Sequence, residues 1–195
     1  MASVASARDK APATPGVGVA VTGALVVLFC IGFATVNVHF EMTDHFANGV
    51  HAEYTSGIAV MNWLVAVLKV MGATLALLSI VKRPRLLPPA LLGVLLWGAF
   101  AMLSVYALGS VIQAVGMASG LAGTADQIDM AGVGYVLFFL LFAAGYGVLA
   151  ISYSRRSGLR KGVAVLGALG APLGLGGILL AVPMLLAALD LLPAP

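Results

Sequence analysis

The sequence predicts an all-α, polytopic membrane protein with five transmembrane helices, its N-terminus inside the cell and its C-terminus outside. Of its 195 residues, 62% are hydrophobic and only 9% are charged. Soluble domains contain about 45–50% apolar and about 25% charged residues, because polar side chains must cover their cores. The composition therefore excludes a soluble enzyme, a disordered chain and a nucleic-acid-binding module, and no nucleic-acid partner is expected.

Five apolar runs are long enough to cross a bilayer. A spanning helix needs about 20 mostly apolar residues, since the hydrocarbon core is about 30 Å thick and a helix rises about 1.5 Å per residue. The runs do not alternate between polar and apolar residues, which excludes a transmembrane β-barrel. They cover residues 16–39, 57–81, 86–116, 132–153 and 163–190.

The first run follows a short polar segment that contains Arg8 and Lys10. A cleaved signal peptide would also begin with positive charge, but this run is longer than a usual signal core and no A-x-A cleavage site follows it. We therefore interpret the run as a membrane anchor. Residues 1–15 are rich in Ala, Ser and Pro, and we expect them to form a disordered cytoplasmic tail before a transmembrane domain over 16–195.

Proline and glycine mark the later runs. Pro88 and Pro89 suit the start of the third helix, where a missing backbone donor costs little. The fifth run holds Gly170-x-x-x-Gly174, a spacing that allows two membrane helices to pack closely. This pattern predicts either tight packing inside the bundle or contact with a partner membrane protein through the fifth helix.

Charge placement orients the helices. Nine of the ten Lys and Arg residues lie before the first run, between the second and third, or between the fourth and fifth. Six of the seven acidic residues lie on the opposite side of the runs. By the positive-inside rule the basic side is cytoplasmic. We therefore expect a multi-pass protein of the cell membrane, in contact with membrane lipid.

Lys69 lies in the middle of the second run. A lysine at the bilayer centre costs about 2.5–3.5 kcal/mol, so an ionisable group there is a candidate functional residue. Its neighbours at helical spacing, including Asn62 and Gly72, are small or polar, which predicts that Lys69 faces the bundle interior. The alternative is a structural lysine that bonds to backbone carbonyls or a hydroxyl.

Other helices carry polar side chains at a similar depth toward the outer side. We expect these side chains and Lys69 to line an outward-facing cavity that binds a lipophilic small molecule. The alternative is that the tyrosines belong to the interfacial belt and the amides bond between helices. The candidate ligand-binding residues are Asn37, Asn62, Lys69, Tyr106, Ser110, Gln113 and Tyr135.

The first outer loop concentrates histidine and acidic residues. Imidazole and carboxylate groups can bind metals or transfer protons, and Glu41, Asp44 and His45 are the catalytic candidates if the chain is an enzyme. No recognised metal-ligand spacing occurs, and the single cysteine, Cys30, excludes a cysteine-based metal centre. We therefore predict no metal and no cofactor.

Three classes of function remain. We favour a non-catalytic accessory subunit or a binder of a lipophilic molecule, because this class requires no motif that the sequence lacks. The alternative is an intramembrane enzyme that acts on a lipid, isoprenoid or quinone-like substrate, with Lys69 stabilising developing negative charge. A small transporter is the third class, although the odd number of spans and the absence of a visible repeat count against it.

Overall fold

A computed structural model describes residues 14–45, 55–81 and 86–188, with side chains for 14–45, 57–81 and 86–177. All regular structure in these ranges is helical, which confirms the predicted all-α class. The five α-helices lie within a few residues of the predicted runs. In chain order the elements are α1 (Val17–Met42), α2 (Thr55–Ile80), α3 (Pro89–Ala118), the short 3₁₀ helix η2 (Ala125–Gln127), α4 (Met130–Arg156) and α5 (Lys161–Ala188).

Two helix starts follow from local sequence. Pro89 is the first residue of α3 and Pro88 precedes it as the N-cap, as expected, so neither ring removes a hydrogen bond within the helix. The Asp129 carboxylate caps α4 by accepting a 2.7 Å hydrogen bond from the Gly132 amide. This bond satisfies one of the donors left free in the first turn.

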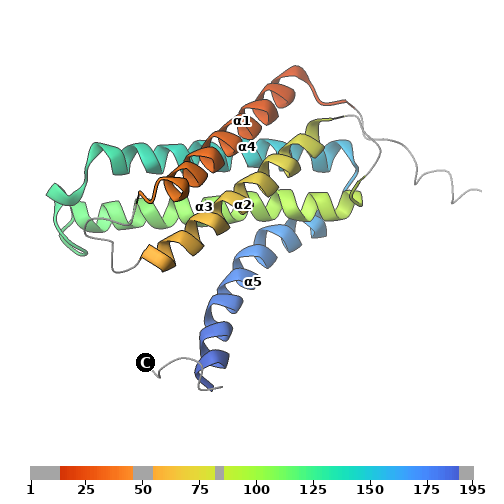
Figure 1. Ribbon diagram of the computed structural model, residues 1–195. Coiled ribbons are helices and arrows are strands. Elements are labelled where there is room, and N and C mark those ends of the chain that lie inside the picture. Colours follow the sequence, from red (N-terminus) through yellow and green to blue (C-terminus); the bar gives the residue numbers. More distant parts are fainter. Residues whose placement is uncertain (1–13, 46–54, 82–85, 189–195) are drawn as a thin grey trace, which may run out of the picture.

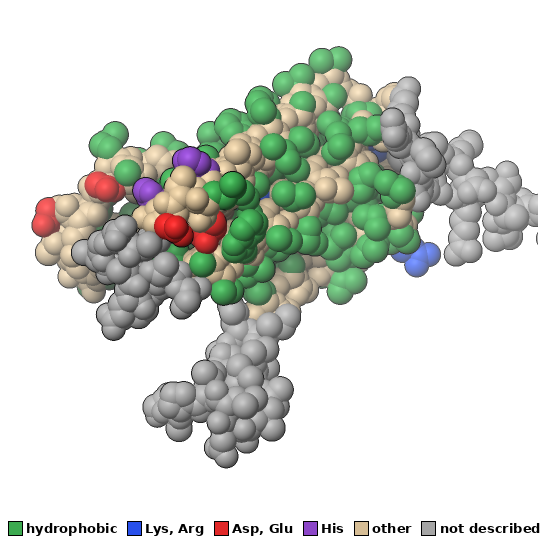
Figure 2. Space-filling model, in the orientation of Figure 1, with side chains coloured by type: hydrophobic (Ala, Val, Ile, Leu, Met, Phe, Trp, Pro, Cys, Tyr) green, Lys and Arg blue, Asp and Glu red, His purple; other side chains and the backbone are tan. Residues whose placement is uncertain are grey.

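Four helices have the length and composition of membrane spans: α1, α2 from Gly57, α3 and α4. Many of their large apolar side chains face outward, for example Leu28 at 66% and Leu141 at 73% exposure. Figure 2 shows this apolar surface over much of the bundle, with the acidic side chains gathered at one end. Such a surface is suited to lipid rather than water. The described apolar part of α5, Lys161–Gly177, is shorter, and its crossing of the bilayer stays a prediction.

The helices form two antiparallel pairs, α1 with α2 and α3 with α4 (Figure 1). Gly23 lies against Ile80 at one end of the first pair, and Asn62 bonds to Glu41 near the other end. The two pairs meet chiefly where α1 packs on α4. This arrangement places the middle of α2 beside both α1 and α4.

The fifth helix packs only its first part against the bundle. Gly167 sits so close to α3 that a Cβ at this position would lie 2.5 Å from the Val94 carbonyl oxygen. Farther along, a Cβ at Gly174 would meet nothing within 4 Å, and α5 extends obliquely away from the other helices (Figure 1). Close packing on α3 therefore involves Gly167 rather than the predicted Gly170 and Gly174 pair.

Most of the best-buried large side chains lie in the half of the bundle that ends at Arg155 and Arg160, and we call this end the basic end. Leu96, Leu149 and Ala150 have no exposed surface there. Toward the opposite, acidic end the same helices expose most of their side chains. The basic half is therefore a packed core, and the acidic half is more loosely packed.

Candidate functional site

The site centres on Lys69, half-buried in the middle of α2. Its Nζ lies 4.9 Å from the ring centroid of Phe33, 5.2 Å from that of Phe139 and 4.7 Å from that of Phe142. All three distances are within the range of cation–π attraction, about 6 Å. We call these three rings the aromatic cage. Lys69 therefore points into the bundle, toward α1 and α4.

The cage is assembled from two helices. Phe33 belongs to α1, while Phe139 and Phe142 are three residues apart on α4 and so share one face of that helix. Phe142 is 3% exposed and belongs to the apolar core. The ammonium therefore rests at the boundary between the packed core and the looser acidic half.

Lys69 forms no hydrogen bond and no ion pair with any residue that the structure describes. An ammonium carries three N–H donors. Aromatic rings attract its charge, but they do not supply the oxygen acceptors that would replace water. The cage thus compensates part of the charge and leaves the hydrogen-bonding capacity of Lys69 unused.

Two predicted tyrosines surround the cage. The Tyr106 ring lies 4.4 Å and the Tyr135 ring 5.6 Å from the ring of Phe139, measured between centroids. Tyr135 also approaches Phe33 at 6.5 Å. The tyrosines therefore contact the cage rings rather than Lys69 itself and form an outer aromatic layer.

The seam between α1 and α2 carries the polar residues nearest the acidic end. The Asn62 amide donates a 2.6 Å hydrogen bond to the Glu41 carboxylate. Asn37 lies one turn of α1 closer to the cage than Glu41 and is 6% exposed. Its side chain has no hydrogen-bond partner among the described residues. Asn37, Asn62 and Lys69 thus belong to one seam, with Glu41 at its acidic end.

The described contacts do not bring the remaining ligand candidates to Lys69. The Ser110 hydroxyl donates to the Tyr106 carbonyl of its own helix at 3.0 Å, and Gln113 is exposed. That Ser110 and Gln113 belong to the binding site therefore stays a prediction.

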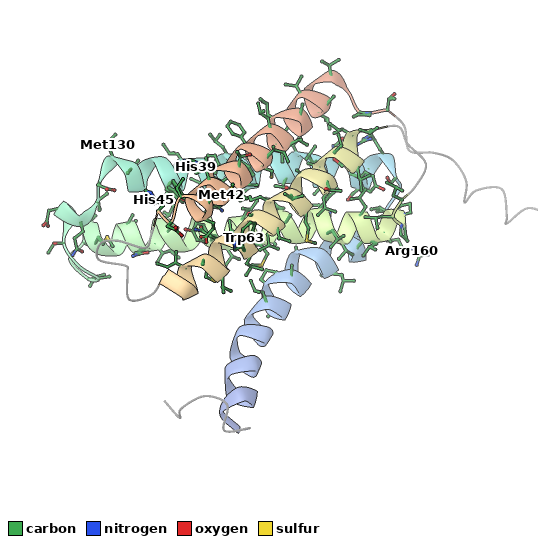
Figure 3. The ribbon with its side chains drawn as sticks, in the orientation of Figure 1. His39, Met42, His45, Trp63, Met130 and Arg160 are labelled. Carbon is green, nitrogen blue, oxygen red and sulfur yellow. The ribbon has the colours of Figure 1, made fainter. Side chains whose placement is uncertain are left out.

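The catalytic candidates lie at the end of α1, away from the cage. Asp44 is exposed, and the His45 ring stacks on Phe40 with centroids 4.4 Å apart. Figure 3 shows His39 and His45 together there, with Arg160 at the far end of the bundle. Within the described ranges no group of three or more His, Cys, Asp or Glu side chains could hold a metal. The rest of the histidine-rich loop, 46–54, lies outside the described residues.

The sequence did not indicate the three cage phenylalanines as site residues. A second contact that it did not indicate lies nearby, where the Cys30 thiol and Tyr146 hydroxyl are 3.6 Å apart and buried. The phenylalanine-rich stretch 138–142 was the available signal. Every face of that stretch is apolar, however, so the sequence did not reveal which rings turn toward Lys69.

The chain matches no protein-family model, no curated protein and no solved structure. The assignment of function therefore depends on the geometry of the site. The features that matter are the caged ammonium, the outer tyrosines and the polar α1–α2 seam.

Proposed function

We propose that this chain is a non-catalytic, multi-pass protein of the cell membrane that binds a lipophilic molecule carrying an anionic group. The anionic group would pair with Lys69, and the apolar part would lie along the loosely packed acidic half of the bundle. One observation carries the proposal: a half-buried ammonium at mid-helix lies over three rings but donates no hydrogen bond to any described residue.

An anionic oxygen would stabilise this ammonium better than the rings alone. A carboxylate or phosphate oxygen accepts a short charge-assisted hydrogen bond, which is about twice as strong as a neutral one. Low local polarity strengthens the pairing further. A ligand with an apolar tail can reach such a group from the lipid, because the helices around it are themselves apolar.

Two alternatives receive less support from the same geometry. An enzyme would need its acid or base near Lys69, but Glu41 lies two turns beyond Phe33 and is engaged by Asn62. A transporter would need a polar route through the basic half, where Leu96 and Leu149 have no exposed surface. We retain the contact of α5 with a partner membrane protein as a secondary proposal.

The test uses the full chain in lipid nanodiscs with a photoreactive long-chain fatty acid as probe. The wild type should be labelled saturably, and the Lys69→Met variant should lose at least about tenfold in affinity, because a charge-assisted hydrogen bond contributes about 1.5–3 kcal/mol and about 1.4 kcal/mol corresponds to tenfold. Lys69→Arg, which keeps the charge, should retain part of the binding.

Lys161→Met is the matched control, since Lys161 is an exposed lysine at the basic end. This variant should bind like the wild type. Equal labelling of Lys69→Met and wild type would refute the proposal. Equal binding of a long-chain alcohol would show that the ligand needs no anionic group and would refute it as well.

A further inference from the structure

Asn37 is a largely buried residue whose side-chain amide makes no hydrogen bond to any described residue. The described residues include two buried polar side chains, Asn37 at 6% and Ser79 at 2% exposure. The Ser79 hydroxyl donates to the Ala76 carbonyl at 2.7 Å, whereas Asn37 has no such partner among the described residues. Among the described residues, the unpartnered side-chain atom that is also sealed from the surface is the Ser157 hydroxyl. The Asn37 amide is therefore not sealed, and a bound group can still reach its donors.

The helix register places Asn37 close to the caged ammonium. The antiparallel alignment that sets Gly23 against Ile80 and Glu41 against Asn62 sets Asn37 opposite Ala66, one turn of α2 from Lys69. Ala66 is 5% exposed and has only a methyl side chain. The register therefore places Asn37 opposite a residue whose side chain cannot hydrogen-bond, one turn from an ammonium that also has no acceptor among the described residues.

We infer that Asn37 and Lys69 together bind one carboxylate group, with the Asn37 amide donating to one oxygen and the Lys69 ammonium to the other. This inference rests on the proposed function and specifies its ligand class. A carboxylate has two acceptor oxygens in one plane, and two side chains on facing helices offer donors one turn apart.

The neighbouring charge favours a carboxylate over a phosphate. Glu41 lies one turn from Asn37, on the same face of α1, and its carboxylate is held in place by Asn62. A phosphate monoester carries about −1.5 to −2 charges near neutral pH, and like charges that face each other in a poorly solvated site are strongly disfavoured. A long-chain carboxylic acid, with one negative charge and an apolar tail, fits the site best.

The test compares palmitate, its methyl ester and a monoalkyl phosphate of the same chain length on the full-length protein in nanodiscs. The Asn37→Leu variant, close in volume to the wild type, should bind palmitate about tenfold more weakly, as expected for one lost hydrogen bond to a charged group. The wild type should prefer palmitate to the other two molecules, and Asn37→Leu should reduce that preference. Thr35→Val, which removes an exposed hydroxyl of α1 that bonds only within its own helix, is the control and should not change binding.

A second variant keeps the test decisive if Asn37→Leu folds poorly. In Asn37→Asp the new carboxylate would occupy the place of the ligand's and pair with Lys69, so palmitate binding should be lost while the chain stays folded. Unchanged palmitate binding in Asn37→Leu or in Asn37→Asp would overturn the role of Asn37, and tighter binding of the alkyl phosphate would overturn the ligand class. If Lys69→Met also binds palmitate normally, the proposed function itself fails.

Discussion

Replacing Lys69 with methionine separates a functional ammonium from a structural one. Methionine keeps an unbranched chain of similar length and removes the charge. If the ammonium serves a ligand rather than the fold, the free protein should tolerate the change well. We therefore expect Lys69→Met to be slightly more stable than the wild type in the absence of ligand.

The magnitude follows from the contacts of the ammonium. A lysine at the centre of a membrane helix costs about 2.5–3.5 kcal/mol relative to water. Three rings at 4.7, 4.9 and 5.2 Å return about 2 kcal/mol together, if each contributes about 0.5–1 kcal/mol, the value for a cation–π contact that keeps access to solvent. The difference leaves the variant more stable by about 1 kcal/mol, or about 2–4 °C in Tm for a chain of this size.

The assay is thermal or denaturant unfolding of the purified chain in mild detergent, with Leu68→Met as the control. Leu68 is the preceding residue on α2 and is 54% exposed, so its substitution should leave the stability nearly unchanged. A loss of about 2 kcal/mol or more in Lys69→Met would refute the reasoning, because it would mean that the ammonium holds the helices together through acceptors.

Three further predictions concern packing and pH. Gly72→Ala places a methyl group against the Tyr146 hydroxyl and should cost about 1–3 kcal/mol of unfolding free energy; adding Tyr146→Phe should restore most of it. Gly167→Ala should weaken the contact of α5 with α3, measured by cysteine crosslinking between them, while Gly174→Ala, which meets nothing within 4 Å, should not. A hydrogen bond with the Thr124 side chain holds the pKa of Asp126 below its ordinary value of 3.8. The stabilisation of η2 should therefore be present above pH 3.8 and should be lost as the pH falls through the pKa that Asp126 has in the folded protein. In an NMR titration of η2, the Asp126→Asn variant should not show this pH dependence.

Part of the candidate site could be predicted because it follows from position along single helices. Lys69 stands out in an apolar run, and its spacing of seven positions from Asn62 places both residues on one side of α2. The partner of Asn62 could not be predicted in the same way. Glu41 was singled out as a catalytic candidate, yet in the fold it accepts a hydrogen bond from Asn62 on the facing helix.

The sequence by itself determined that the chain is helical and suited to a membrane, because a long apolar segment in lipid must satisfy its backbone hydrogen bonds within one helix. Only the tertiary structure decided what surrounds Lys69. Helices that are apolar on every side carry no signal for the face that turns inward. The positions of Phe33 and Phe142 against the ammonium, and of Asn37 opposite Ala66, therefore depend on how small residues let the helices approach one another.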